Sequence, residues 1–262
     1  MGNALKIFRK EIKEVLINRS IWLPILAISL MFSILFPAAI TILIEDMVKD
    51  PDATGFIAKI FQTTENIETA MLDFIIRQFM VFLLLIPAML PSLIAPASIV
   101  LEKENNTLEP LLATPVSTGQ LLLGKTLTSM VPSFIISLTD FILITIVVDT
   151  IAWIKFNIIP LPTWEWFVVT FILSPAISFI ITMLSLIISS KSTDIRSAQG
   201  IGAVIIFPIY AVIGMQIAGL FLLDVKFIII ACAVLIGICP VLLKIAVKTF
   251  DRENILTRWK FK

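Results

Sequence analysis

Long apolar segments recur along the chain, and short polar stretches separate them. Six segments reach the roughly 20 residues that an α-helix needs to cross a hydrocarbon core of about 30 Å. Each contains at least one proline, which membrane helices tolerate because their neighbours can satisfy the freed backbone groups. The pattern predicts an all-α integral membrane protein with six transmembrane helices in a single domain, residues 1–262. The predicted spans lie at about 21–44, 74–100, 121–148, 164–188, 200–223 and 227–247.

A shorter amphipathic pattern precedes the first span. Its apolar positions repeat at intervals of three and four residues, and basic residues lie between them. This pattern predicts a helix lying in the inner membrane interface. It does not fit a cleavable signal peptide, because the span that follows is longer than the apolar region of a signal peptide. The apolar positions are Leu5, Phe8, Ile12 and Val15, and the basic ones are Lys6, Arg9, Lys10 and Lys13.

The basic residues are distributed unevenly between the two sides that six spans would define. With the N-terminus inside, the outer segments hold 5 of the 20 Lys and Arg residues and the inner segments hold the other 15. This bias predicts a multi-pass protein of the cell membrane with both termini cytoplasmic. Asp73 and Arg77, four residues apart at the outer end of the second span, are expected to pair. The outer basic residues are Lys49, Lys59, Arg77, Lys155 and Lys226.

Composition supports the membrane prediction and excludes several functions. Apolar residues make up 58% of the chain and charged residues 15%, against roughly 45–50% and about 25% in soluble domains. The net charge of +1 provides no field that would attract nucleic acid. The chain has no histidine, and so lacks the usual acid–base group at neutral pH and the commonest metal ligand. We predict no catalytic residue and no metal site.

The loop between the second and third spans carries the most specific pattern, LEKENNTLEPLLATPVSTGQLLLGK, residues 101–125. Leu108, Leu111 and Leu112 would form one face of a short helix, with Thr107 as its cap and Pro110 in its first turn. A capped helix with exposed leucines fits a groove on a soluble partner. The alternative is a solvated loop that only connects the two spans.

From Glu102 to Lys125 the order of residues resembles the hallmark loop of ABC-2-type transporter permeases, although Asn106 stands where that family often has Gly. The resemblance implies a cytoplasmic coupling helix seated in a cleft of an ATP-binding subunit. It also implies two copies of that subunit, which would bind ATP and Mg, and a second copy of this permease or a homologous one in the lipid bilayer. No cofactor is then expected in this chain. The implied contact residues are Glu102, Glu104, Thr107, Leu108, Glu109, Leu111, Leu112, Thr114 and Pro115.

Residues 119–126, GQLLLGKT, match the Walker A pattern letter for letter. A phosphate-binding loop follows a strand and is otherwise small and open, so that its amides can face phosphate. Here three leucines fill the loop and a membrane span follows. We therefore assign ATP hydrolysis to a separate partner chain and predict that this protein is not itself an enzyme.

Two polar stripes run along the predicted third and fourth spans at helical spacing. They could line an export route, with Ser133, Ser137, Asp140, Ser178 and Ser185 as candidate translocation-path residues. Alternatively, small hydroxyl residues let membrane helices pack closely. Asp140 could serve function or structural pairing, because an acid inside a span is costly. The stripes are Thr126, Ser129, Ser133, Ser137 and Asp140, then Ser174, Ser178, Thr182, Ser185 and Ser189.

These features together predict the permease subunit of an ATP-driven ABC exporter. It would move an unidentified substrate out of the cell or between leaflets. Two alternatives stay open, a secondary transporter and a non-transporting membrane scaffold. A secondary transporter would need charges within its spans, where Asp140 stands almost alone.

Overall fold

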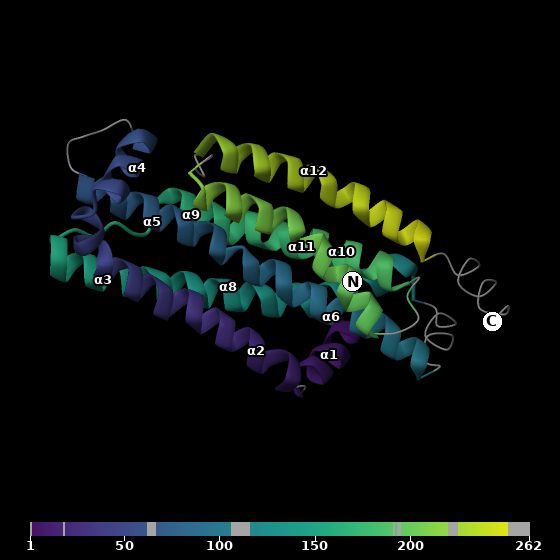
Figure 1. Cartoon of the computed structure of the whole chain (residues 1–262). Helices are drawn as coiled ribbons and strands as arrows, with labels where there is room; N and C mark the ends of the chain where they lie inside the picture. Colours follow the sequence, from purple (N-terminus) through teal and green to yellow (C-terminus); the bar gives the residue numbers. More distant parts are fainter. Residues whose placement is uncertain are drawn as a thin grey trace.

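The computed structural model describes residues 2–17, 19–61, 67–105, 116–190, 192, 195–219 and 225–250. Within them the regular structure is entirely helical, which confirms the predicted all-α class. The long helices run side by side as an elongated bundle (Figure 1). Their bounds are α1 Gly2–Ile17, α2 Arg19–Leu30, η1 Met31–Leu35, α3 Phe36–Val48, α4 Pro51–Phe61, α5 Ile67–Leu83, α6 Leu85–Glu104, α8 Thr118–Phe156, α9 Trp164–Val168, η2 Val169–Leu173, α10 Ser174–Ser189, α11 Ile195–Ile217 and α12 Val225–Thr249.

Five helical runs are long and apolar enough to cross a membrane. The segment predicted as the fifth span, 200–223, falls on α11 and on residues 220–223, which lie outside the described residues. Within the described residues, the apolar part of α11 is Gly202–Ile217, which is shorter than a full crossing. The described residues therefore support a multi-pass protein and five of the six predicted spans. The five runs are Trp22–Ile44, Thr69–Glu102, Thr118–Phe156, Trp164–Ser189 and Val225–Thr249.

Two π-helical segments and one helix break each lie just before a proline. Proline has no N–H, and its ring clashes with the carbonyl four residues earlier. The π-helical segments η1 and η2 end two residues before Pro37 and Pro175, and α5 gives way to α6 at Leu84, three residues before Pro87. In each case the backbone widens or breaks before the proline, and the apolar run then continues.

The run formed by α5 and α6 is the centre of the bundle, and α12 lies at its edge (Figure 1). In the most apolar window of each, 83% of the residues are buried for 69–102 and 11% for α12. The exposed side chains of α12 include Ile229, Ile230, Val234 and Val241. A surface of this kind suits lipid as the solvent. Within α5, Arg77 Nε donates to Asp73 Oδ2 at 2.8 Å, which confirms the predicted pair.

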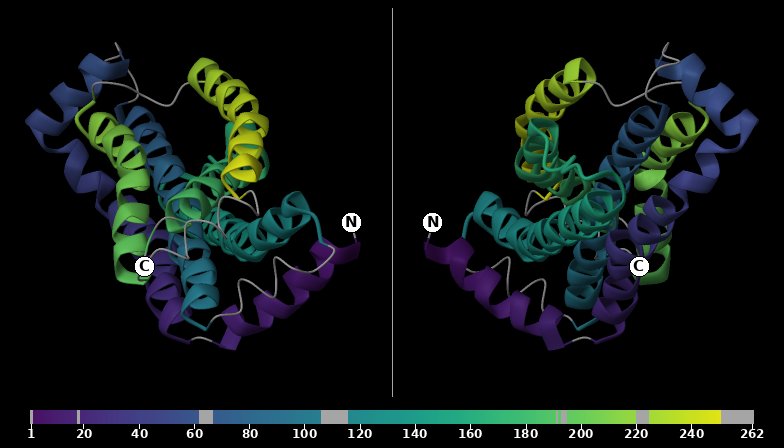
Figure 2. Two further views of the ribbon diagram at one scale, coloured as in Figure 1. Left: turned by 90° about the vertical axis from the view of Figure 1, so that its right-hand side faces the viewer. Right: turned by 90° about the vertical axis from the view of Figure 1, so that its left-hand side faces the viewer.

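The short helix α1 lies crosswise to the long helices (Figure 2). It confirms the helix predicted before the first span, and Ala4 and Glu11 are buried on the side that packs against α8. α1, the C-terminal end of α12 and the facing ends of α6 and α8 lie at one end of the bundle, and α4 lies at the other (Figure 1). The ends of α6 and α8 that flank the predicted coupling loop thus lie near α1, and residues 106–115 themselves lie outside the described part of the chain.

Candidate coupling site

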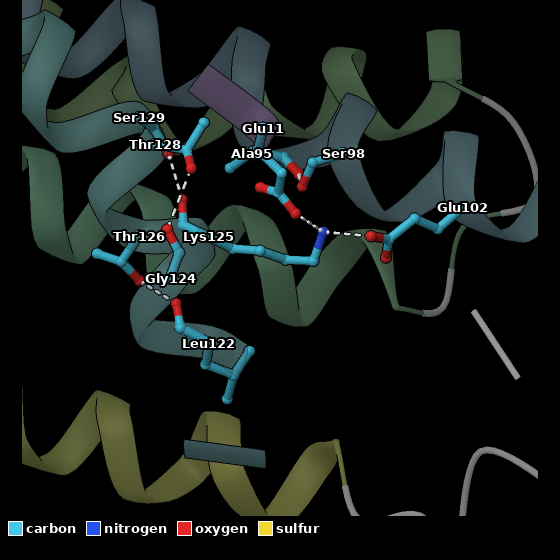
Figure 3. A network of polar contacts seen from close by, with 10 residues as sticks. All are labelled: Glu11, Ala95, Ser98, Glu102, Leu122, Gly124, Lys125, Thr126, Thr128 and Ser129. Carbon is cyan, nitrogen blue, oxygen red and sulfur yellow. Dashed lines mark hydrogen bonds and ion pairs between the residues drawn. The ribbon is translucent and has the colours of Figure 1, made fainter. Parts of the chain in front are cut away.

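A cluster of three charged side chains joins α1, α6 and α8 (Figure 3). Lys125 Nζ donates to Glu11 Oε1 at 2.7 Å and to Glu102 Oε1 at 2.9 Å. The Lys125 side chain is 1% exposed, and the Glu11 and Glu102 side chains are 9% and 17% exposed. A buried ion pair of this kind is stable only while each charge keeps its partner, because an unpaired buried charge costs several kcal/mol.

Local sequence determines where α8 begins and so where Lys125 lies. Ser117 and Gln120 form a capping box, in which each side chain accepts a hydrogen bond from the other residue's backbone N–H. The helix therefore starts at Thr118, three residues earlier than the predicted span, and α6 continues to Glu104, four residues later than predicted. Lys125 and Glu102 consequently lie on the helical ends that border the loop.

Gly124 brings α1 into place beside Lys125. A Cβ at this position would lie 3.0 Å from the Ala4 carbonyl oxygen and 3.0 Å from Ile7 Cβ. Only a residue without a side chain lets the two helices approach this closely. The close approach puts Glu11, one turn after Ile7 on α1, within reach of Lys125.

The cluster carries more negative than positive charge. Two carboxylates share one ammonium, and Glu11 Oε2 is buried without a hydrogen-bond partner among the described residues. A cavity of about 280 Å³ adjoins the cluster between α1 and α6, and Lys10, Glu14, Ile94 and Ser98 are among its lining residues. Beside this cavity, Lys125 binds one carboxylate of each helix, Glu11 of α1 and Glu102 of α6.

The same geometry excludes a phosphate-binding loop at 119–126. These residues belong to α8, and their backbone follows a helix from the cap at Ser117 onward. The Lys125 ammonium points into the protein and is held by two carboxylates (Figure 3). Residues 119–126 therefore match the Walker A pattern in sequence but not in structure.

Most of the predicted coupling residues lie outside the described residues. Glu102 ends the central run and binds Lys125, and Glu104 is the last residue of α6. The sequence reasoning missed Glu11 and Lys125 as partners. The available signals were a lysine at the end of an apolar span and an acid among the bases of the first helix. The coupling residues outside the described part are Thr107, Leu108, Glu109, Leu111, Leu112, Thr114 and Pro115.

The two polar stripes are buried inside the packing of the single chain. Ser174 Oγ donates to Ser137 Oγ at 3.2 Å, which joins α10 to α8, and Ser178 Oγ donates to the Pro87 carbonyl at 3.0 Å, which joins α10 to α6. Ser133 bonds its own helix at the Ser129 carbonyl. Ser185 is also buried. These contacts are those that close helix packing requires, and a role in translocation stays a prediction.

Asp140 lies farther along the same face of α8. It is 3% exposed and accepts a hydrogen bond from Ser29 Oγ of α2. The bond ties the first and third spans together within the apolar part of the bundle. Its partner is a neutral hydroxyl, so the contact supplies structural pairing without a counter-charge.

The fold and the site together define a multi-pass helical membrane protein whose N-terminal helix is tied to the ends of two spans. Residues 57–234 match the family described as ABC-2 family transporter protein. The match covers more than half of the chain, so the protein belongs to the ABC-2 transporter family, whose members are membrane transport subunits that associate with ATP-binding subunits. A comparison with curated proteins finds no significant match.

Proposed function

We propose that this chain is the permease subunit of an ATP-driven exporter. It would move its substrate outward or between leaflets when separate ATP-binding subunits close on ATP. The observation that carries the proposal is the ion pair between Glu102 of α6 and Lys125 of α8, which joins the two helices on either side of the segment that resembles the family's coupling loop. A connection held in this way can transmit force into the bundle, whereas a loosely attached loop cannot.

In this proposal the loop has two parts with different tasks. Glu102 anchors its base, because its carboxylate is directed at Lys125. Residues 107–115 make the contact with the ATP-binding subunit, with Leu108, Leu111 and Leu112 as the apolar face that enters a groove. ATP and Mg are bound by that partner, and this chain contributes no catalytic residue.

The proposed arrangement in the membrane has six crossings. α11 has 23 residues and would be about 34 Å long, enough for the core of a bilayer. With α11 as the fifth crossing, both termini and the coupling loop lie on the cytoplasmic side, in agreement with the distribution of Lys and Arg. Two permease copies, or this chain and a homologue, would associate with two ATP-binding subunits.

The polar seam between α8 and α10 is the candidate translocation path of this proposal. It holds Ser133, Ser137, Ser178 and Ser185 in an otherwise apolar bundle, and Asp140, which accepts a hydrogen bond from Ser29 of α2, continues the polar positions along α8. A route along it would require α8 and α10 to separate and expose hydroxyl groups that now bond within the chain. Movement of the loop that precedes α8 is a direct means of producing such a separation.

Purification with the partner tests the proposal. The chain is co-expressed with candidate ATP-binding subunits, purified in mild detergent and assayed for co-purifying protein and ATP hydrolysis. We expect a stoichiometric ATPase with the natural chain and its loss when Leu108, Leu111 and Leu112 are all changed to Glu, because charged side chains cannot enter an apolar groove. Ile159→Glu is the control, since Ile159 is 65% exposed in the connection between α8 and α9.

The two possible failures have different meanings. Full retention of the ATPase by the three-leucine variant would remove the coupling role from this loop. A natural chain that brings down no ATPase, from membranes in which the candidates are present, would favour a secondary transporter or a scaffold.

A further inference from the structure

The cavity between α1 and α6 combines apolar side chains with an excess of carboxylates. Its volume of about 280 Å³ is close to the lower end of the range for ligand sites. The carboxylates belong to Glu11, Glu14 and Glu102, and Lys10 is the one cation that the described residues contribute to the lining. Even when Lys125 beside the cavity is counted, three negative charges stand against two positive ones. The cavity therefore favours a ligand with a positive charge.

The hydroxyl groups of the lining face a ligand as acceptors. Ser98 Oγ donates to the Ala95 carbonyl at 3.0 Å, and Thr128 Oγ1 donates to the Gly124 carbonyl at 3.1 Å (Figure 3). Each hydroxyl thus uses its hydrogen within its own helix, and its lone pairs remain for a donor. Asn105, at the exposed rim, is the one neutral side chain of the described lining that can still donate. The cavity therefore suits a ligand with several N–H or O–H donors.

Glu11 supplies a buried acceptor that lacks a donor. Its side chain is 9% exposed, and its Oε1 accepts a hydrogen bond from Lys125 Nζ. Its Oε2 is buried and has no hydrogen-bond partner among the described residues. Such an orphaned oxygen is costly, because a buried polar atom loses its bonds to water without gaining others. A donor placed in the cavity beside Glu11 would remove this cost.

The chemistry of the lining selects among cations. No three acids of the described residues lie close enough together to hold a metal ion. A primary ammonium group fits the lining, because it carries one positive charge and three N–H donors. A quaternary ammonium group has the same charge but no N–H, so it cannot satisfy Glu11. Lys10 borders the same cavity, where its charge also acts on Glu102, and it can bind an anionic group of the same ligand.

The position of the cavity indicates the source of the ammonium group. α1 lies at one end of the bundle, beside the ends of two runs that are long enough to cross a membrane (Figure 1), and this is the depth of the lipid headgroups. Ile94, Ala97 and Leu101 extend the lining along one face of α6. We propose that the cavity binds the headgroup of a membrane phospholipid with a primary ammonium group, the ammonium at Glu11 and the phosphate at Lys10. The acyl chains lie outside the cavity, in the bilayer.

Binding of such a lipid goes beyond the proposed function, because it needs neither the ATP-binding partner nor the exported substrate. The headgroup would fill the space between α1 and α6 and neutralise the excess negative charge of the lining. It would also supply the donor that Glu11 Oε2 lacks. The lipid is thus a component of the α1–α6 contact.

The test measures which lipids bind to the purified full-length chain. Native mass spectrometry in mild detergent records the binding of added phosphatidylethanolamine and of phosphatidylcholine with the same acyl chains. We expect phosphatidylethanolamine to bind at least about tenfold more tightly, because its ammonium can donate hydrogen bonds to Glu11 and a choline group cannot. Glycerophosphoethanolamine, which has the same headgroup without acyl chains, should bind more weakly than the lipid. This comparison separates a lipid site from a site for a soluble amine.

Two variants locate the binding in this cavity. Glu11→Gln replaces a carboxylate oxygen with a donor, and Ala97→Leu fills space in the cavity without changing a charge. Each should weaken the binding of phosphatidylethanolamine at least about tenfold, and Ala97→Leu serves if Glu11→Gln does not fold. Glu165→Gln is the control and should bind as the natural chain does, because it makes the same change in α9, outside the lining.

Three results would overturn the inference, and none of them bears on the proposed function. One is equal binding of phosphatidylethanolamine and phosphatidylcholine. Another is undiminished binding of phosphatidylethanolamine by either cavity variant in its folded form. The third is binding of glycerophosphoethanolamine as tight as that of the lipid, which would assign the cavity to a soluble amine. Failure to recover an ATPase partner would contradict the proposed function and leave the lipid site standing.

Discussion

At the scale of single residues, burial determines how much an ion pair contributes. Asp73 and Arg77 form a pair whose side chains are 44% and 24% exposed, and water competes with such a bond. Lys125 has side-chain atoms that are almost completely withdrawn from solvent. The N–O distances of the Asp73–Arg77 and Glu11–Lys125 pairs are similar. Only the Glu11–Lys125 pair is buried deeply enough that water cannot easily replace a missing partner.

Removal of the Lys125 ammonium is therefore expected to destabilise the fold. Lys125→Met keeps much of the side-chain volume and removes the ammonium that Glu11 and Glu102 share. We expect a loss of about 3–5 kcal/mol in the free energy of unfolding. The measurement is denaturant unfolding in detergent. Asp73→Asn, which breaks the exposed pair, should change the same quantity by no more than about 0.5 kcal/mol.

The explanation is electrostatic, and a compensating variant can check it. Adding Glu11→Gln and Glu102→Gln to Lys125→Met removes every charge from the cluster and keeps its approximate shape. Much of the lost stability should return, because replacing a whole buried ion pair is often neutral. If the combined variant were as unstable as Lys125→Met alone, packing of the lysine stem would be the cause.

At the scale of helices, the packing of α1 on α8 depends on Gly124. Gly124→Ala would place a methyl group against the backbone and side chains of α1, which must then shift. We expect a cost of about 1–3 kcal/mol, as for other overpacked sites. Gly237→Ala in α12 is the control, because no atom lies within 4 Å of its Cβ position, and it should stabilise by about 0.5–1 kcal/mol. Equal stability of the two variants in unfolding experiments would contradict the described α1–α8 contact.

Helix positions could be predicted from the sequence, and helix neighbours could not. Apolar periodicity reports which residues share a face, and it located α1, the five long runs and the two polar stripes. It contains no information about which helix covers that face. The bonds between Ser174 and Ser137 and between Lys125 and Glu11 join residues 37 and 114 positions apart, so they depend on packing in three dimensions.

In the candidate site, too, one part could be predicted from the sequence and another part could not. The coupling loop was predicted from the order of its residues, because a specific sequence pattern can be recognised without knowledge of the fold. In the sequence, Gly124 and Lys125 stand out only as the last residues of the family-like pattern and as part of a misleading Walker-like match. Their roles depend on α1, a helix that lies about 100 residues earlier and outside the matched residues 57–234.

At the scale of the whole molecule, the number of crossings decides where the C-terminus lies. Each crossing reverses the side of the membrane, so six spans return the C-terminus to the side of the N-terminus and five do not. The undecided element is α11, whose apolar part is Gly202–Ile217. The coupling proposal needs the α6–α8 connection on the cytoplasmic side, and it needs α11 to cross if the end of α12 is to lie there too.

Cysteine labelling in intact cells distinguishes these arrangements. Cys232 and Cys239 are both free and are first replaced by Ala. Single cysteines then replace three exposed residues, Lys6 in α1, Ile159 after α8 and Lys248 near the end of α12. With six crossings, a membrane-impermeant maleimide should label position 159 in intact cells and positions 6 and 248 only after permeabilisation. Labelling of both 159 and 248 in intact cells, with 6 protected, would mean that α11 does not cross and that the C-terminus lies outside. Labelling of position 6 in intact cells would invert the whole arrangement and place the α6–α8 connection away from any cytoplasmic ATPase.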